Sequence, residues 1–161
     1  MSVQNFSPWN KGHIIGQKKP LQIPHIWGIR IRLELECKTR DLSLFNLGLD
    51  SKLRGCDLVK LKVSDVTCGR NILGRVHIVQ QKTGSPVQFE TTPNTRNSLM
   101  SWIEKAKLRE SDYLFWSQKD HSKHLSTRQY NRIFHGWIEK LNIDLSIWHS
   151  LNETNKAIFN L

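Results

Sequence analysis

The sequence has little cysteine, no long apolar run and few acidic residues. Its three cysteines, Cys37, Cys56 and Cys68, are odd in number and show no Cys-x-x-Cys spacing, which argues against a disulfide framework or a zinc knuckle. No apolar stretch approaches the ~20 residues of a membrane helix, and the polar first residues do not resemble a signal peptide. We therefore expect a cytoplasmic protein that makes no use of a membrane.

Nucleotide and metal motifs are also missing. Neither Gly-x-x-x-x-Gly-Lys-Ser/Thr nor Gly-x-Gly-x-x-Gly occurs, so a nucleotide-binding enzyme is disfavoured. His121 and His124 lie three residues apart, but in a polar, lysine-rich stretch with no carboxylate partner at useful spacing. We expect no bound metal, no cofactor and no small-molecule substrate.

The shortage of acidic residues leaves a strong positive charge. Lys plus Arg number 24 and Asp plus Glu 14, which gives a net charge of +10 and an isoelectric point near 9.8. Residues 1–40 hold seven Lys or Arg against two Glu, so half of the excess lies there and half in the remainder. This distribution favours a folded face for a polyanionic partner, although a basic domain with no nucleic-acid role has the same composition.

The chain of 161 residues fits one domain. Residues 1–23 have little periodicity and are expected to form an extended or poorly ordered lead-in to a domain at 24–161. Apolar residues then recur at three- and four-residue steps, which predicts helices. The expected helices run from Pro24 to Leu35, from a Thr39 cap to Gly48, from Ser51 or Lys52 to Leu61, from Asn94 or Thr95 to Leu108, and onward from a Ser126 cap.

Between these helices the apolar pattern changes to that of β-strands. Residues 76–80 and 87–90 alternate as strands do, and the Gly and Pro of residues 82–86 suit the turn between them. Residues 63–67 are expected to add a third strand. The predicted fold class is α+β, mainly helical with a small three-stranded antiparallel β-sheet.

Arg54 and Lys82 are the first candidates for a functional site. Asp57 follows Arg54 by three residues, and its carboxylate can position the guanidinium so that the fork grips two phosphate oxygens. On these residues alone, such a pair is more commonly a surface ion pair that stabilises a helix. Lys82 lies in the predicted turn, where an ammonium can reach a phosphate and protonate a leaving 5′ oxygen, or simply be solvated.

Several short motifs, in this order, resemble the tyrosine recombinase or phage integrase family. Any one motif is weak, but the order and spacing of the set are family-like, and the match spans roughly residues 24–151. The motifs are Arg54-x-x-Asp57-Leu58-x-x-Leu61, Val63-Ser64-Asp65-Val66, Gln80-Gln81-Lys82-Thr83, Asp112-Tyr113-Leu114-Phe115, His124 to Tyr130, and Trp148-His149-Ser150-Leu151.

The resemblance implies a catalytic domain that acts on DNA. In that family a tyrosine attacks a DNA phosphate, while two arginines, a histidine and a lysine stabilise charge on the phosphoryl oxygens and handle protons. Within it Arg54 matches the first arginine, Lys82 the β-hairpin lysine, and His149 the histidine of His-x-x-Arg. No metal or cofactor is implied.

The sequence departs from the family pattern after His149. Asn152 stands where the second arginine is expected, and no tyrosine follows before Leu161. Tyr113 and Tyr130 match scaffold positions instead. We therefore expect a C-terminally truncated recombinase domain that is catalytically incompetent alone. Apolar Trp148, Ile158 and Phe159 would then be left partly uncovered and favour self-association.

Double-stranded DNA is the expected partner. Lys52, Lys60, Thr83 and Arg128 flank the motifs or lie near a helix N-terminus, and they are predicted as further backbone contacts, with solvated surface roles as the alternative for each. Binding should be mostly phosphate-driven and strongly salt-dependent. A second hypothesis is a noncatalytic DNA-binding or interaction module that occupies recombination sites or pairs with intact recombinases.

Overall fold

The computed structural model describes residues 21–142. The first twenty residues of the predicted lead-in and everything after Asn142 lie outside this range. Leu21 is only 1% exposed and belongs to the hydrophobic core, so the core begins just before the first helix. No helix in the described part of the chain combines the length and apolar character needed to cross a membrane.

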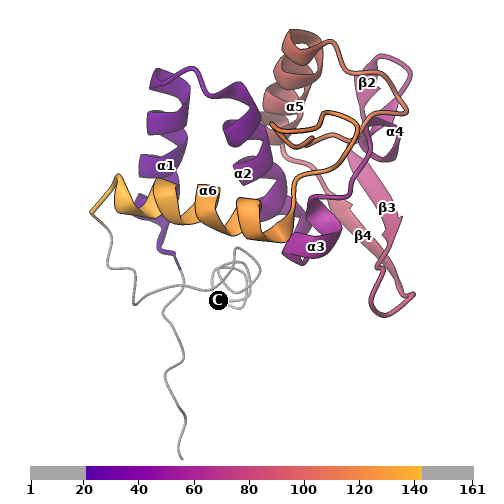
Figure 1. Ribbon diagram of the computed structural model, residues 1–161, viewed down its shortest axis with the longest axis horizontal. Coiled ribbons are helices and arrows are strands. Elements are labelled where there is room, and N and C mark those ends of the chain that lie inside the picture. Colours follow the sequence, from indigo (N-terminus) through magenta and orange to yellow (C-terminus); the bar gives the residue numbers. More distant parts are fainter. Residues whose placement is uncertain (1–20, 143–161) are drawn as a thin grey trace, which may run out of the picture.

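Two antiparallel helices open the fold, α1 (Ile23–Leu35) and α2 (Thr39–Ser51) (Figure 1). Both were predicted, although α2 continues three residues past Gly48. Pro24 lies in the first turn of α1, where its missing N–H leaves no hydrogen bond unmade. Helix α2 is the central element, because every residue from Ser43 to Leu49 is buried.

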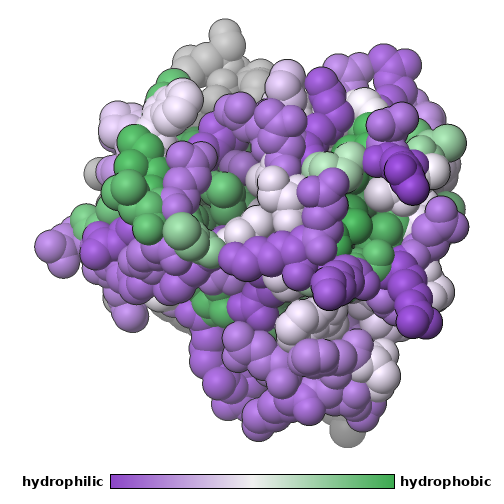
Figure 2. Space-filling view, turned by 90° about the horizontal axis from the view of Figure 1, so that it is seen from above, coloured by the Kyte–Doolittle hydropathy of each residue, from purple (hydrophilic) through white to green (hydrophobic). Residues whose placement is uncertain are grey.

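Helix α1 carries an exposed apolar stripe in addition to its buried face. Ile26, Ile29 and Leu33 face the core. The exposed stripe has one large apolar side chain every fourth residue, and these side chains are 51–79% exposed: Ile23, Trp27, Ile31 and Leu35. Figure 2 shows apolar side chains gathered on the side where α1 lies, within a largely hydrophilic surface.

The predicted third helix, from residue 51 or 52 to Leu61, is wrong in length. Lys52 adopts a left-handed conformation with φ 53° and ends α2, and Arg54 is extended with φ −65° and ψ 147°. Only α3 (Gly55–Leu58) is helical. Arg54 is therefore the residue before a short helix, not a position inside a long one.

The predicted three-stranded sheet is replaced by two separate hairpins. Strand β1 (Thr67–Cys68) pairs with β2 (Asn71–Ile72), and β3 (Arg75–Val79) pairs with β4 (Pro86–Glu90), both antiparallel. The β3–β4 hairpin confirms the prediction for those two segments.

The segment expected as the third strand is mostly helical. It forms α4 (Val63–Val66) because Asp65 Oδ2 accepts a hydrogen bond from Lys62 N at 2.8 Å and caps a helical turn.

The last two helices are α5 (Pro93–Ala106) and α6 (Thr127–Glu139). Thr92, not Asn94 or Thr95, is the N-cap of α5, and its Oγ1 accepts from Thr95 N. Ser126 caps α6 as predicted, with its Oγ accepting from Gln129 N at 3.2 Å. Helix α6 runs across α1 and α2 and reaches α3 at its N-terminal end (Figure 1).

Aromatic packing holds α6 in that position. Trp137 meets Phe45 of α2 edge-on with ring centroids 5.5 Å apart. At the other end a Cβ on Gly55 would lie 3.2 Å from the ring of Tyr130, so glycine allows α3 to approach α6 closely. Burial raises the pKa of Tyr130 well above its usual range.

A polar network lies inside the α2–α5 interface. Asn46 Nδ2 donates to Ser98 Oγ at 3.2 Å, and Ser43 Oγ donates to Ser98 O at 2.6 Å. Arg30 Nε of α1 donates to Asn46 Oδ1 at 2.8 Å. Buried and partly buried side-chain hydrogen bonds thereby join α1, α2 and α5.

Candidate phosphate-binding site

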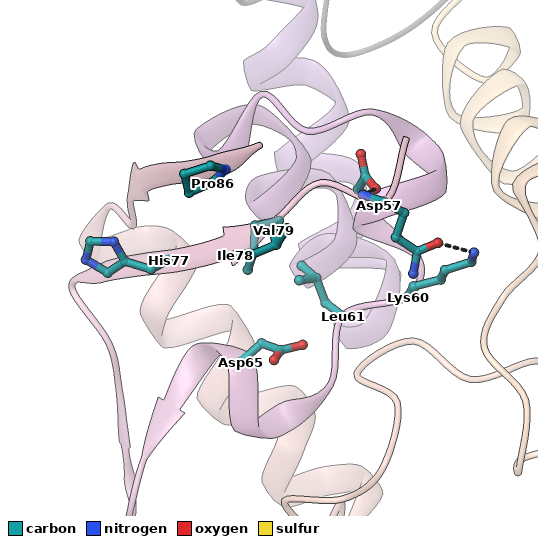
Figure 3. Close-up of a pocket in the computed structure, with 9 residues that line it drawn as sticks. Asp57, Lys60, Leu61, Asp65, His77, Ile78, Val79 and Pro86 are labelled. Carbon is teal, nitrogen blue, oxygen red and sulfur yellow. Dashed lines mark hydrogen bonds between the residues drawn. The ribbon is translucent and has the colours of Figure 1, made fainter. Parts of the chain in front are cut away.

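The β3–β4 hairpin is tied to α3 where its turn begins. Asp57 is 5% exposed, and its Oδ1 accepts a hydrogen bond from Gln81 N at 3.1 Å. Lys60 Nζ donates to Gln81 Oε1, the dashed contact in Figure 3. Two side chains around α3 thus hold the residue directly before Lys82. Sequence reasoning missed this function of Asp57 and Lys60, because the bonds join residues more than twenty positions apart.

The predicted Asp57–Arg54 pair does not form. The Asp57 carboxylate binds the hairpin, and the Arg54 side chain is exposed, with no hydrogen bond or ion pair to residues 21–142. The other Asp57 oxygen, Oδ2, is buried and has no hydrogen-bond partner within the same range. Asp57 therefore positions the hairpin, while all five N–H donors of the Arg54 guanidinium are available to a ligand.

Lys82 occupies the hairpin turn, as predicted. Gly84 takes φ 64°, a left-handed conformation that favours glycine, and Gly84 N donates to Gln80 O at 2.8 Å. Gln80 N donates to Ser85 O at 2.9 Å. The turn exposes the Lys82 side chain, which makes no hydrogen bond or ion pair within the described residues.

The predicted backbone contacts have different surroundings. Thr83 Oγ1 donates to Gln80 Oε1 at 3.1 Å inside the turn. Lys60 is half-buried and holds Gln81. Lys52 is exposed at the end of α2, and Arg128 is exposed in the first turn of α6. Their contacts with DNA stay predictions.

His149 and Asn152 lie outside the described residues, as do Trp148, Ile158 and Phe159. The structure thus brings together the elements that carry Arg54 and Lys82, and the predicted third member of the site is not among the described residues.

The two tyrosines of the sequence are both in the described part. Tyr130 is 5% exposed in the core. Tyr113 packs against His124, with ring centroids 5.3 Å apart, and beneath the Lys62 ammonium. Both are held by packing in the scaffold.

A hollow of about 350 Å³ lies between α3, α4 and the hairpin, and Figure 3 shows its lining. Asp57, Asp65, Lys60 and His77 contribute side chains to it. Two carboxylates make it a poor receptor for phosphate, so the exposed side of Arg54 and Lys82 suits an anion better. Within residues 21–142 no three His, Cys, Asp or Glu side chains are grouped to hold a metal.

A family model matches most of the chain. The phage integrase family model covers residues 30–153, which includes all elements from within α1 to α6 and continues through the His149 motif. The chain belongs to the phage integrase family. Its members are tyrosine recombinases, the enzymes of site-specific recombination and DNA integration.

Solved structures have the same fold. The structure of XerA recombinase matches with a TM-score of 0.70 and 17% identity, over 88% of this chain and 50% of that one. The Tn1549 transposon integrase, in complex with transposon right end DNA, matches with a TM-score of 0.63 and 14% identity, over 86% and 52%.

At such identities the likeness shows the fold alone. The chain spans about half the length of these structures. A search of curated proteins gives no match.

Proposed function

We propose that this phage integrase domain binds duplex DNA and holds one backbone phosphate between Arg54 and Lys82. The observation that supports this proposal most is the pair of hydrogen bonds that join Asp57 and Lys60 to Gln81. These bonds fix the hairpin turn beside α3, while the side chains of Arg54 and Lys82 stay exposed. A guanidinium fork fits two nonbridging phosphate oxygens, and an ammonium adds a movable point charge.

The roles of the two groups follow from their chemistry. In this proposal Arg54 stabilises negative charge on the phosphoryl oxygens, and Lys82 donates a proton to a leaving 5′ oxygen. His149 is proposed as the third group of the same site, on the resemblance of Trp148-His149-Ser150-Leu151 to the family motif. The solved Tn1549 integrase complex with transposon DNA supports a nucleic-acid ligand.

We further propose that residues 1–161 do not cleave and rejoin DNA without help. Asn152 cannot supply the cationic fork of a second arginine, and loss of one such donor costs on the order of 10²–10³ in rate. Tyr130 is buried with a raised pKa and Tyr113 is packed against His124, so neither is available as a nucleophile.

Binding is tested with a labelled DNA duplex and fluorescence anisotropy between about 50 and 200 mM salt. The wild-type chain should bind with an affinity that falls steeply with salt. Arg54→Ala combined with Lys82→Ala should weaken binding about tenfold or more. The matched control, Lys107→Gln with Arg109→Gln, removes the same charge at the end of α5. If the two double variants weaken binding equally, Arg54 and Lys82 contribute only general charge attraction, and the proposed phosphate site is wrong.

The proposed inability to cleave DNA is tested with a nicked suicide substrate that traps covalent protein–DNA intermediates. The proposal expects no protein–DNA adduct from the chain alone. A covalent adduct whose tyrosine maps to Tyr113 or Tyr130 would overturn this part of the proposal and leave DNA binding intact. Pairing with an intact recombinase stays a prediction, since no observation on residues 21–142 favours it over DNA binding alone.

A further inference from the structure

Two adjoining hollows lie away from Arg54 and Lys82, where α2 begins and where the loop before α6 passes. They measure about 290 and 370 Å³, and both are lined by Arg40 and Gln118. Lys119 and Arg132 line the first, and Lys105 the second. We call Arg40, Lys105, Lys119 and Arg132 the basic groove.

Arg40 gives the groove a fixed cation. Its Nε and Nη2 donate to Asp41 Oδ1 at 3.1 and 3.0 Å, and both side chains are 14% exposed. The other carboxylate oxygen of Asp41 accepts from Trp137 Nε1 at 3.3 Å. A guanidinium has five N–H donors, so Arg40 keeps donors for a ligand while Asp41 is already engaged at both oxygens.

The other three cations of the groove have no acidic partner. Lys119 and Arg132 are exposed and their side chains make no hydrogen bond or ion pair within the described residues. Lys105 Nζ donates only to neutral acceptors, Cys37 O at 3.4 Å and Thr39 Oγ1 at 3.3 Å. The groove therefore holds more positive charge than its single lining carboxylate, Asp41, can balance.

Nearby acids are paired elsewhere. The Ser122 hydroxyl, followed by the Lys123 ammonium, lowers the pKa of Asp120 to about 2, and Lys123 forms an ion pair with it at 3.1 Å. Glu36 beside the turn of α1 and α2 accepts from Lys140 and Lys38. Neither acid is left to neutralise Lys119 or Arg132.

We propose that the basic groove binds phosphate groups of a nucleic-acid backbone, as a second contact beyond Arg54 and Lys82. The inference rests on the proposed function and extends the DNA path along α6. Arg132 follows Arg128 by four residues, about 6 Å along a helix axis, so a backbone that passes Arg128 continues toward the groove. Two guanidinium groups and two ammonium groups around two hollows suit successive phosphates better than a single small anion.

The test uses the full chain with Lys119→Gln and Arg132→Gln, two exposed substitutions that leave Arg40 and the core intact. Affinity and its salt dependence are measured on a short duplex and on a longer one, with the Lys107→Gln and Arg109→Gln variant as the charge-matched control. The groove variant should lose about tenfold in affinity for the long duplex and about two in the salt slope. It should lose less on the short duplex.

Several outcomes would overturn the inference. Loss no greater than in the charge-matched control would show that the groove makes no specific backbone contact. Equal loss on both duplexes would place the groove outside an extended DNA path. Loss of binding to polyglutamate with DNA affinity unchanged would assign the groove to an acidic protein segment. If Arg54→Ala with Lys82→Ala weakens binding and the groove variant does not, only this inference fails; if neither does, the proposed function fails too.

Discussion

The α2–α5 interface and the junction of α3 with the β3–β4 hairpin both bury polar groups, but they satisfy them to different degrees. In the α2–α5 interface Asn46 donates to Ser98 and accepts from Arg30. At the hairpin junction one oxygen of Asp57 binds Gln81 N and the other is buried without a partner in the described residues. A hydrogen-bond network in which every buried group has a partner is typical of a structural role. A buried group without a partner, beside exposed cations such as Arg54 and Lys82, is typical of a functional site.

The largest effect should come from the completed network. Asn46→Ala removes the carboxamide between Ser98 and Arg30, and it should lower the free energy of unfolding by about 2 kcal/mol, because buried partners lose their hydrogen bonds. DNA affinity measured under native conditions should change less than twofold. Urea unfolding with a binding titration checks both, and a large loss of affinity in a stable variant would break the contrast between the two regions.

A smaller effect is expected at the hairpin junction, where a substitution should lower DNA affinity more than stability. Asp57→Asn keeps an acceptor for Gln81 N but removes the charge that holds it, so DNA affinity should fall about fivefold, on the order of 1 kcal/mol. Stability should change by less than about 1 kcal/mol, since a buried carboxylate also carries a desolvation cost. Amide exchange at Gln81 should become faster.

Asp65→Asn is the matched control for this change. It removes a carboxylate from the same hollow and keeps a residue that caps α4. Faster exchange at Gln81 in both variants would mean that charge in the hollow, rather than the Asp57 hydrogen bond, positions the turn.

The smallest effect concerns the tyrosine that supports α3. Burial raises the pKa of Tyr130 in the folded chain above its unfolded value near 10. The folded state then keeps the Tyr130 hydroxyl proton to a higher pH than the unfolded state does. The stability that protonated Tyr130 contributes is therefore complete below pH ~10 and is lost as the pH rises above that value. The melting temperature should fall between pH 9 and pH 11, and Tyr130→Phe should reduce that fall. An equal drop in Tyr130→Phe would contradict this.

The local sequence pattern was sufficient to predict those helices and strands whose stabilising contacts are close in sequence. The helix after Ser126 is capped by its own Ser126 and Gln129, and the β3–β4 turn contains its own Gly84. The predictions failed where distant contacts decide. The apolar residues of 51–61 fit a helix, but Lys52 adopts a left-handed conformation and Gly55 packs under Tyr130, so only one turn forms.

The candidate site follows the same division. Arg54 and Lys82 were predicted from the order of the motifs, and their part in a site stays a prediction; the structure shows that the hairpin of Lys82 contacts α3, which Arg54 precedes. The function of Asp57 was assigned to the wrong partner, because a spacing of three residues suggested Arg54 and nothing in the sequence indicates a bond to Gln81 N. Hydrogen bonds to a backbone amide in a distant turn leave no signature in residue types.

A double-mutant cycle on duplex affinity tests most directly whether Arg54 and Lys82 act on one phosphate. Affinities are measured for the wild type, Arg54→Ala, Lys82→Ala and the double variant at one salt concentration. Two cations on the same phosphate should be coupled, with the double variant departing from the sum of the single losses by about 1 kcal/mol. Losses that add to within about 0.3 kcal/mol would show two independent contacts and contradict the account.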